Sequence, residues 1–313
     1  MPISGVLPVI PTPFRDGVFD RASFQRLLDH MLPWVDGYTL MGSTGEAPSL
    51  PDAQRAQIVA EALAMTPAGK TVVAGVSHTS ADAAAELARH AQEHGAAGVL
   101  CCSPFYFANS PDGIYAHLAR IDAAIEIELV LYDNPFTTKT PLQADWVIDW
   151  ARRLSRLNSV KLTDHDLGKI PLWREAGLTV LAGDDPILSQ FLAAGVDGAM
   201  VIAPAVLPES FATAWARMRA GDLDGALRIV STELAPFIHA FGIGDEIATT
   251  KALYAEIGIF DSGELLSPLQ PVAPARAQQL KQAYELGRDA GLARLAADDG
   301  AAAAPAADGI PAR

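Results

Sequence analysis

An alternation of short β-rich runs and longer amphipathic runs, repeated eight times before Gly221, constrains the fold more than any other feature of the sequence. The predicted strands span residues 5–10, 37–41, 71–76, 98–102, 128–132, 159–162, 179–182 and 198–202. The predicted helices span residues 21–32, 52–64, 81–94, 111–124, 142–153, 168–176, 186–194 and 208–220. Strands separated by such helices pair in parallel through right-handed crossovers. Eight units predict an α/β fold, a closed (β/α)8 TIM barrel, with a doubly wound open sheet as the alternative.

The strand pattern stops after Gly221, and only helical patterns follow. Helices predicted at residues 223–241, 245–257 and 273–290 would form a smaller helical domain. The final stretch is rich in alanine, proline and aspartate and has little apolar surface to bury, which is typical of disorder. We therefore expect a catalytic barrel domain over residues 1–221, a C-terminal helical domain over residues 222–293 and a disordered tail over residues 294–313.

Composition argues against several classes of protein. The 313 residues carry a formal net charge of −14, which is unfavourable for binding nucleic acid or an anionic membrane surface. The two cysteines, Cys101 and Cys102, are adjacent in an apolar run, which predicts buried and reduced thiols. We find neither the pattern of a secretory signal peptide nor an apolar run of the roughly 18 residues that a membrane helix needs. We expect a soluble, cytoplasmic protein.

Lys161 is the most informative single residue. Five of the six lysines lie in predicted helices or loops, where a solvated ammonium costs little: Lys70, Lys139, Lys169, Lys251 and Lys281. Lys161 instead lies in a strand-like run, between Val160 and Leu162. A lysine buried in a barrel tends to lose its proton, and a neutral amine is a nucleophile that forms an imine with a carbonyl substrate. The alternative is an edge lysine whose ammonium reaches solvent.

Other candidate residues follow predicted strands, at the end of the barrel where catalytic groups lie. The turn Gly42-Ser43-Thr44-Gly45-Glu46 follows the second strand. Its N–H groups and two hydroxyls are suited to binding a carboxylate, although such a sequence is also common in ordinary turns. Tyr106 follows the fourth strand, and Tyr132 ends the fifth, next to Lys161 on the sixth. A phenol can move protons to and from a substrate, but a tyrosine at a strand end often serves packing alone.

The turn Gly42-Ser43-Thr44-Gly45-Glu46, the run Tyr132-Asp133-Asn134-Pro135 and Lys161, in this order, resemble the dihydrodipicolinate synthase/N-acetylneuraminate lyase family. The resemblance extends from about residue 5 to about residue 290. It includes Pro11-Thr12-Pro13-Phe14, Gly183-Asp184-Asp185, Lys251-Ala252-Leu253-Tyr254 and Pro268-Leu269-Gln270-Pro271. The resemblance implies a class I, Schiff-base lyase on a (β/α)8 barrel with a C-terminal helical domain. It also implies a homotetramer, a dimer of dimers, that needs no metal or other cofactor.

The resemblance further implies roles for individual residues. Lys161 corresponds to the lysine that forms an imine with pyruvate or another 2-keto acid, and Tyr132 to the tyrosine that moves protons beside it. Ser43 and Thr44 correspond to the pair that binds the keto-acid carboxylate, and Ser43 can also join the proton relay. Tyr106 corresponds to a tyrosine that completes the relay from a neighbouring subunit. The active oligomer would then be at least a dimer.

Three further positions concern substrate binding. Gly42 belongs to the carboxylate-binding turn, and Met200, on the eighth strand, would offer the substrate only a backbone contact. Thr137 stands where the synthases of the lysine precursor carry an arginine that binds the carboxylate of the aldehyde substrate. A hydroxyl cannot replace a bidentate guanidinium, and Lys139 is the nearby candidate to compensate. The run at residues 162–166 replaces a small, glycine-containing run, and it would either meet substrate hydroxyls or form a solvated loop.

We therefore predict a retro-aldol lyase or aldolase that cleaves or forms a C–C bond next to the imine of pyruvate or a related 2-keto acid. Within the same chemistry, the alternatives are a 2-keto-3-deoxy sugar acid dehydratase and 4-hydroxy-tetrahydrodipicolinate synthase, which joins pyruvate to aspartate semialdehyde. A non-catalytic keto-acid sensor is disfavoured by the intact Lys161 and Tyr132. A metal-dependent barrel enzyme is disfavoured because consecutive residues of a regular strand cannot all face one ion. Its ligands would come from Asp164, His165, Asp166, Asp184 and Asp185.

Overall fold

A ring of eight parallel strands forms the centre of the protein in a computed structural model that describes residues 2–241 and 244–303. In ring order the strands are β1 (Gly5–Val6), β10 (Gly198–Ala199), β9 (Thr179–Ala182), β8 (Leu157–Leu162), β7 (Glu128–Asp133), β6 (Gly98–Cys102), β5 (Thr71–Gly75) and β4 (Gly37–Leu40). A parallel bridge between Val9 and Thr39 brings the first and last strands of the ring together. The barrel prediction is confirmed, and the open-sheet alternative is wrong.

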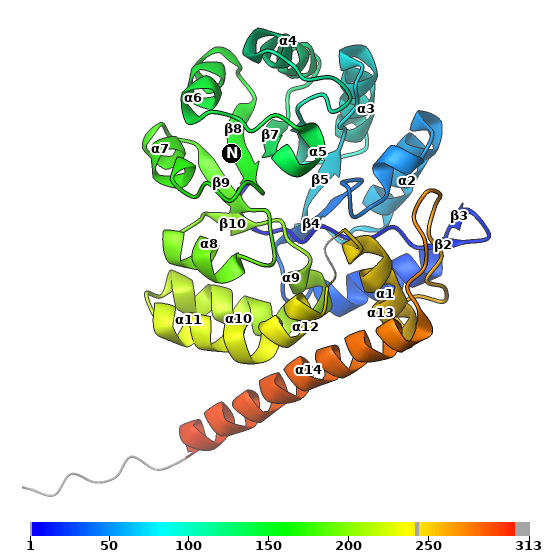
Figure 1. Ribbon diagram of the computed structural model, residues 1–313, viewed down its shortest axis with the longest axis vertical. Helices are drawn as coiled ribbons and strands as arrows, with labels where there is room; N and C mark the ends of the chain where they lie inside the picture. Colours follow the sequence, from blue (N-terminus) through cyan, green and yellow to red (C-terminus); the bar gives the residue numbers. More distant parts are fainter. Residues whose placement is uncertain (1, 242–243, 304–313) are drawn as a thin grey trace, which may run out of the picture.

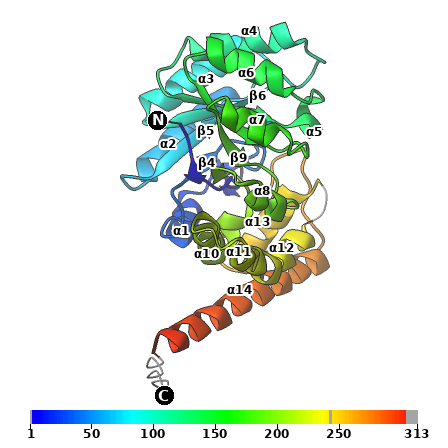
Figure 2. The same ribbon diagram turned by 90° about the vertical axis from the view of Figure 1, so that its left-hand side faces the viewer.

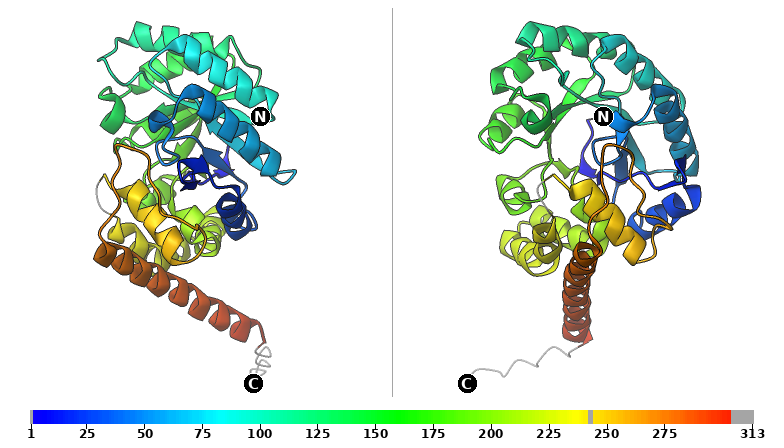
Figure 3. Two further views of the ribbon diagram at one scale, coloured as in Figure 1. Left: turned by 90° about the vertical axis from the view of Figure 1, so that its right-hand side faces the viewer. Right: turned by 45° about the vertical axis from the view of Figure 1, so that its right-hand side comes forward.

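Helices cover the outside of this ring (Figure 3). The eight predicted helices are present as α1 (Arg21–Met31), α2 (Asp52–Met65), α3 (Ala81–Glu93), α4 (Pro111–Asp122), α6 (Ala144–Arg153), α7 (Lys169–Glu175), α8 (Leu188–Ala194) and α10 (Pro208–Arg219). Asp20, Ser80 and Ser110 begin α1, α3 and α4 by accepting N–H groups of the first turn. Three short elements were not predicted because they are too short to show a period: η1 (Ala47–Ser49), α5 (Pro135–Thr138) and α9 (Ala203–Val206).

A small antiparallel hairpin, β2 (Phe14–Arg15) and β3 (Val18–Phe19), lies outside the barrel sheet and was also not predicted. Its tip is Asp16-Gly17, and both residues have positive φ, 53° and 74°. This dipeptide is a strong signal for a two-residue hairpin turn, so the sequence did contain the information. Glu264, in the loop between α13 and α14, accepts the Asp16 and Gly17 N–H groups at 2.7 and 2.8 Å and so fixes the hairpin to the C-terminal region (Figure 1).

The first C-terminal helix, predicted as one element over residues 223–241, is divided in three. It consists of α11 (Leu223–Ile229), a π-helical turn η2 (Val230–Leu234) and α12 (Ala235–Ala240). Pro236 lies in the first turn of α12. Proline has no N–H to donate, and its ring clashes with the carbonyl four residues earlier in a regular helix. The wider π turn before Pro236 avoids that clash, so the prediction of one continuous helix is wrong.

The last two helices are α13 (Glu246–Glu256) and α14 (Pro274–Ala303). Helix α14 packs against α12, α13 and η2 and projects beyond the body of the molecule (Figure 2). Gly287 and Gly291 allow this close approach, because a Cβ atom there would lie 2.1 and 2.9 Å from Glu233 atoms. The buried Glu233 carboxylate accepts hydrogen bonds from Ser210 at 2.6 Å and from Arg294 at 2.8 Å. These contacts fix α14 to the body.

Helix α14 also continues past residue 294, where the disordered tail was expected to begin, and ends at Ala303. Alanine has the highest helix propensity of all residues, which explains the extension. Residues 304–313 of the expected tail lie outside the described residues. The hydrophobic core is continuous from the barrel into the C-terminal helices, where it includes Tyr254 and Tyr284. The division into two domains at residue 221 stays a prediction.

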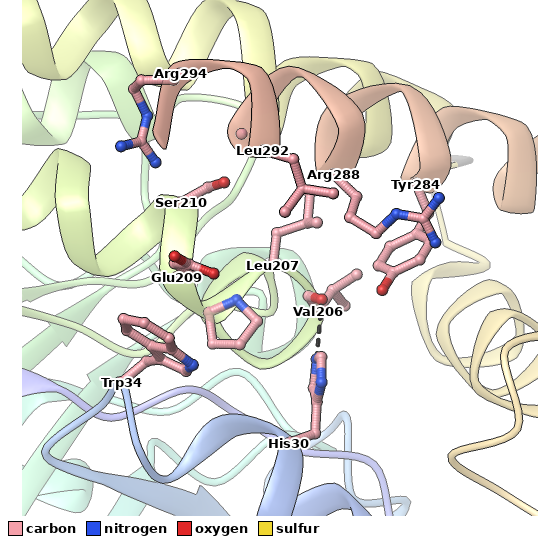
Figure 4. A pocket seen from close by; sticks show the side chains of 12 residues that line it. His30, Trp34, Val206, Leu207, Glu209, Ser210, Tyr284, Arg288, Leu292 and Arg294 are labelled. Atoms are coloured by element: carbon pink, nitrogen blue, oxygen red, sulfur yellow. Dashed lines mark hydrogen bonds between the residues drawn. The ribbon is translucent and has the colours of Figure 1, made fainter. Parts of the chain in front are cut away.

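A cavity of about 190 Å³ lies between α14 and the outside of the barrel (Figure 4). Trp34, Tyr284 and Leu292 are among the residues that line it. His30 also faces it, with Nε2 3.1 Å from the carbonyl of Val206, and burial lowers the pKa of His30. The lining contains none of the predicted site residues, so this cavity marks the junction of α14 with the barrel.

Both cysteines are free and buried, as predicted. Burial raises the pKa of the Cys101 thiol well above its ordinary value, and it raises the pKa of Cys102 as well. Thiols in such surroundings are poor nucleophiles. Among the described residues, no helix combines the length and the apolar character needed to cross a membrane.

Candidate active site

The carboxyl ends of β7, β8 and β9 are held together by hydrogen bonds, and this end of the barrel carries most of the predicted site. The Thr163 N–H donates to the carbonyl of Asp133 at 2.9 Å, and the Thr163 hydroxyl donates to the carbonyl of Gly183 at 3.0 Å. Lys161 lies two residues before Thr163 and pairs with Tyr132 on β7 and Leu181 on β9. The side chains that follow these three strands therefore start from a fixed frame.

Lys161 and Tyr132 lie side by side inside this frame. Lys161 is 4 % exposed and Tyr132 is 8 % exposed. The Lys161 Nζ lies 4.2 Å from the centroid of the Tyr132 ring. In the described part of the chain, Nζ has no hydrogen-bond or ion-pair partner. The structure thus brings together the two residues that the sequence placed on neighbouring strands, and it leaves the amine available to a ligand.

Lys161 is not the only buried lysine, contrary to our expectation that the other five are solvated. Lys169 is 5 % exposed and Lys251 is fully buried. Both are paired with carboxylates, Lys169 with Asp133 at 2.8 Å and Lys251 with Glu46 at 2.6 Å. A buried ammonium needs such a partner. Lys161 is therefore distinguished by its lack of a carboxylate among the described residues, which the sequence alone did not reveal.

The Tyr132 hydroxyl is oriented by Asn134, a residue to which sequence reasoning gave no role. The Asn134 Nδ2 donates to the Tyr132 hydroxyl oxygen at 3.0 Å. Because that bond uses a lone pair of the phenol, its proton remains free to be donated elsewhere. The Asn134 Oδ1 is buried without a hydrogen-bond partner within the described residues. The sequence signal for Asn134 was its place in the run Tyr132-Asp133-Asn134-Pro135, which carries part of the family resemblance.

The turn Gly42–Glu46 follows β4, which lies four strands from β8 in the ring of eight and so faces it across the barrel mouth. Ser43 is exposed, and Thr44 is 8 % exposed. Neither hydroxyl has a hydrogen-bond partner among the described residues. The Thr12 hydroxyl supports the turn by donating to the Gly45 carbonyl at 2.9 Å. The turn therefore carries two unengaged hydroxyls at the end of the barrel that also holds Lys161.

A buried ion pair supports the far side of this turn. Glu46 has a φ of 60°, in the left-handed region, and its side chain is fully buried. One carboxylate oxygen accepts from Lys251 of α13, and the other accepts the Leu266 N–H at 2.7 Å. Burial lowers the pKa of Lys251, and the charge of Glu46 opposes that shift. The C-terminal helices thus fix the geometry of a turn that the barrel contributes.

Three predicted residues are placed differently from Lys161 and Tyr132. Tyr106 is 81 % exposed and contacts Phe107, itself 73 % exposed, edge-on at 5.0 Å between ring centroids. Thr137 is exposed on α5, and its hydroxyl donates to the Asn134 carbonyl at 3.3 Å. Met200 is fully buried, and its N–H donates to the Ala182 carbonyl at 2.8 Å. A single chain therefore does not bring Tyr106 into the buried cluster.

Lys139, the candidate to compensate for the missing arginine, does not point into the site. Its ammonium donates to the carbonyl of Phe136 at 2.8 Å, within its own short helix. Lys169, a buried cation that follows β8, binds Asp133 and Asp164. Burial lowers the pKa of Lys169, but the hydrogen bonds to both carboxylates outweigh burial and raise it. Asp133 also accepts the Leu142 N–H at 3.3 Å.

The remaining acidic residues at the mouth have separate partners. The His165 Nε2 and the Asp184 Oδ2 are 2.8 Å apart. Asp185 accepts the N–H groups of Ile202 and Ala203, each at 2.8 Å, and burial raises its pKa to about 6. No three histidine, cysteine, aspartate or glutamate side chains of the described residues are grouped so that they could hold a metal ion. The proposed ligand set of a metal enzyme is thus dispersed over different contacts.

Comparisons with known proteins agree with this geometry. Residues 2–286 match the Dihydrodipicolinate synthetase family. The 4-hydroxy-tetrahydrodipicolinate synthase 2 of Streptomyces coelicolor is 33 % identical over 285 residues, which cover 90 % of this chain and 94 % of the relative. The synthase structure from Methylacidiphilum fumariolicum superimposes with a TM-score of 0.88 at 26 % identity, covering 94 % of this chain and 99 % of that one. An E. coli prophage protein of the same family, solved in complex with pyruvate, has a TM-score of 0.83 at 25 % identity over 90 % of this chain and 99 % of its own.

Fold, site and relatives together define the class of protein: an enzyme, a Schiff-base-forming lyase of the class I aldolase type on a TIM barrel. The match extends over nearly the whole chain and is not confined to the barrel. The chain belongs to the dihydrodipicolinate synthetase family. The class of enzyme that the sequence predicted is confirmed.

Proposed function

We propose that Lys161 forms an imine with pyruvate or a related 2-keto acid and that the enzyme cleaves or forms a C–C bond beside that imine. The observation that carries this proposal is the buried Lys161 amine, without a described protein partner, 4.2 Å from the centroid of the Tyr132 ring. The E. coli relative in complex with pyruvate supports a keto acid of this size. A barrel mouth lined by fixed strand ends supports catalysis by orientation.

The chemistry follows from the amine. Lys161 attacks the ketone carbon, and the resulting carbinolamine loses water to give an imine. The protonated imine nitrogen withdraws electrons from the imine carbon. A bond from the neighbouring carbon to hydrogen, or to a carbon substituent, can therefore break, and its electron pair moves into the C=C bond of an enamine. In the synthetic direction the enamine carbon attacks an aldehyde, and hydrolysis of the new imine releases the product and free Lys161. Cleavage is the same sequence in reverse.

The turn Gly42–Glu46 would hold the carboxylate of the keto acid. The Ser43 and Thr44 hydroxyls can each donate to a carboxylate oxygen, and Gly42 allows the backbone to approach it. The buried Glu46–Lys251 pair keeps the turn in place. With the carboxylate fixed on one side of the mouth and Lys161 on the other, the ketone would be presented to the amine. The Met200 backbone would border the substrate.

Tyr132 would donate and accept the protons that imine formation requires. Its hydroxyl proton is free because Asn134 donates to its oxygen. We further propose that Ser43 and the Tyr106 of a second subunit complete the relay. The exposed Tyr106 and Phe107 rings are large apolar groups that a partner chain would cover. The active form would be a homotetramer built as a dimer of dimers.

The first candidate reaction is the retro-aldol cleavage of a hydroxylated 2-keto acid, or its formation in the reverse direction. The structure offers little to bind a carboxylate on the aldehyde substrate: Thr137 has no guanidinium, and the Lys139 ammonium donates to a backbone carbonyl. Condensation of pyruvate with aspartate semialdehyde is the second candidate. This candidate is supported by the Streptomyces coelicolor relative, which is 33 % identical to this chain and is named 4-hydroxy-tetrahydrodipicolinate synthase 2. Dehydration of a 2-keto-3-deoxy sugar acid uses the same imine and differs only in expelling a hydroxyl group.

The test is to trap the imine. Protein incubated with pyruvate and borohydride should gain the mass of a reduced pyruvate adduct on the peptide that contains Lys161. The Lys161→Ala variant should gain none and lose turnover, whereas Lys139→Ala, which removes an exposed lysine at the same end of the barrel, should behave like the parent. An adduct at another lysine, or a Lys161→Ala variant as fast as the parent, would contradict the proposal. Pyruvate release, loss of water without cleavage, and consumption of aspartate semialdehyde then separate the three reactions.

A further inference from the structure

The loops after β7, β8 and β9 converge on one polar pair at the rim of the site. His165 follows β8, and Asp184 follows β9 by two residues. Their side chains meet at 2.8 Å between Nε2 and Oδ2. Phe136, from α5 after β7, places its ring against the His165 ring with centroids 5.3 Å apart. Residues that follow three different strands thus position this pair. A loop that is merely exposed to solvent would not need such contacts.

The pair lies close to the reacting amine. Asp184 directly follows Gly183, whose carbonyl accepts the Thr163 hydroxyl two residues beyond Lys161. Burial raises the pKa of Asp184, while the hydrogen bond to His165 and the charge of Lys161 oppose the rise. Asp184 is 22 % exposed and His165 is 54 % exposed, so the pair extends from the buried site to solvent. A second substrate that approaches a Lys161-bound enamine from solvent would pass it.

The charges at the rim disfavour an anionic second substrate. Of the described lysines that follow β7 and β8, Lys139 donates to a backbone carbonyl and Lys169 binds two carboxylates. The negative charge of Glu246, on α13, lies near enough to raise the pKa of Asp184 further. A substrate carboxylate would therefore meet acidic neighbours and no unengaged cation from these loops.

The hydrogen-bonding capacity of the pair suits a hydroxyl group instead. A carboxylate only accepts, so the His165 Nε2 carries the proton in the 2.8 Å contact. In the neutral ring, Nδ1 is then an acceptor, and within the described residues it has no protein partner. The second carboxylate oxygen of Asp184 is also an acceptor. The pair thus offers two free acceptors, which can each accept an O–H of a polyhydroxylated substrate and which repel a carboxylate.

We infer that the His165–Asp184 pair determines specificity for the second substrate, and that it selects an uncharged, hydroxyl-bearing aldehyde over a deoxygenated or carboxylate-bearing one. This inference rests on the proposed aldol chemistry at Lys161. His165 and Asp184 would act by binding the hydroxyls and so orienting the aldehyde, while the imine forms without them. A site that hydrogen-bonds a substrate hydroxyl discriminates against the analogue that lacks it, because its own polar groups are left unpaired.

The experiment compares three aldehydes as acceptors of pyruvate: glyceraldehyde, propionaldehyde, which lacks both hydroxyls, and succinic semialdehyde, which carries a carboxylate. The parent enzyme should prefer glyceraldehyde over each of the others in kcat/KM by about tenfold or more. His165→Ala and Asp184→Asn should each reduce that preference by about tenfold. His94→Ala, an exposed histidine at the end of α3, is the matched control and should keep the parent's preference.

Two measurements show whether each variant still forms the imine with pyruvate: borohydride trapping of the adduct on Lys161, and the KM for pyruvate. Both should be unchanged in His165→Ala and Asp184→Asn; if either fails to fold, His165→Gln serves in its place. Equal rates with all three aldehydes in the parent, or an equal fall for all three aldehydes in the variants, would overturn the inference. Failure of the proposed function is distinguishable, because it appears as the absence of an adduct on Lys161 in the parent.

Discussion

Tyr132 and Lys161 are paired residues on adjacent parallel strands, and the Lys161 Nζ lies 4.2 Å from the centroid of the Tyr132 ring. Residues paired in a parallel sheet point to the same side of it, so the backbone register keeps these side chains together. The hydroxyl of Tyr132 lies beyond the ring and receives the Asn134 amide. The ring therefore packs against the lysine, whereas the hydroxyl is the group that we propose moves a proton, and the two can be tested separately.

The Tyr132→Phe variant keeps the ring and removes the hydroxyl. We expect kcat to fall by about 10²- to 10⁴-fold, the usual contribution of one positioned proton-transfer group, with a small change in thermal stability. Steady-state kinetics with pyruvate and the accepted aldehyde measure the effect. Tyr115→Phe, on α4 where the ring stacks with Arg153, is the control and should retain full activity. A Tyr132→Phe enzyme within about twofold of the parent would show that the phenol moves no proton in a slow step.

The buried pair of Glu46 and Lys251 predicts a large effect on stability. Lys251→Met leaves the Glu46 carboxylate buried with the Leu266 N–H as its remaining described partner. Removing one member of a buried ion pair typically costs about 3–5 kcal/mol in the free energy of unfolding. We expect a loss of that size in urea denaturation, together with a raised KM for pyruvate because the turn Gly42–Glu46 loses its support.

The double variant Glu46→Gln/Lys251→Met should lose less than the sum of the two single variants, because no unpaired charge remains. Lys281→Met, a half-buried lysine on α14, is the control and should change the free energy of unfolding by about 0.5 kcal/mol or less. If Lys251→Met costs less than about 1 kcal/mol, the pair does not hold the turn and the account of the carboxylate site would need revision.

The sequence predicted the barrel and the Lys161–Tyr132 contact for the same reason. Strand and helix patterns are local, and consecutive strands of a parallel barrel are neighbours, so residues at the ends of two consecutive strands meet. The Glu46–Lys251 pair joins residues 205 positions apart in the chain. No local pattern marks such a contact, so Lys251 was expected to be solvated. The Lys169–Asp133 and His165–Asp184 pairs have a different cause: their residues follow consecutive strands, but the loop conformation, which no period in the sequence predicts, determines which side chains meet.

Two errors in secondary structure have local causes. The hairpin at Asp16-Gly17 carried a recognisable turn signal, but its strands are only two residues long and show no alternation. In the segment 223–241, the helical period is strong enough to conceal the break at Pro236, which a proline inside a helical pattern should have indicated. The proposed role of Tyr106 would require a partner subunit, which a single chain does not contain.

Inter-subunit complementation tests the role of Tyr106. We expect Lys161→Ala and Tyr106→Phe to be almost inactive alone. When the two proteins are mixed, unfolded and refolded together, a mixed dimer has one site with an intact Lys161 and an intact Tyr106 from the partner subunit. Random pairing would then restore about a quarter of the parent's activity, if the interface is the same patch on both subunits. Refolding each variant alone is the control. Native mass spectrometry shows whether mixed oligomers form. If they form and activity does not recover, Tyr106 acts in the site of its own chain or takes no part in the mechanism.

His117 predicts how stability depends on pH. This residue of α4 is 5 % exposed, with Nε2 3.8 Å from the Cys101 sulfur. Burial, together with the charge of His78, lowers the pKa of His117 from 6.5 to about 4. Its contribution to stability is therefore complete above pH 6.5 and is lost as the pH falls toward 4, because only the unfolded chain then binds the proton.

The His117→Gln variant lacks this proton site. Between pH 7.5 and pH 4.5, the free energy of unfolding of the parent should fall by about 2–3 kcal/mol more than that of the variant, measured by urea denaturation at both pH values. Asp185, with its pKa raised to about 6, has the opposite effect over part of this range, but both proteins contain it and it cancels in the difference. His94→Gln, at an exposed position, should follow the parent. If the difference between parent and His117→Gln does not change with pH, the folded and unfolded chains bind this proton equally well, and burial does not lower the pKa of His117.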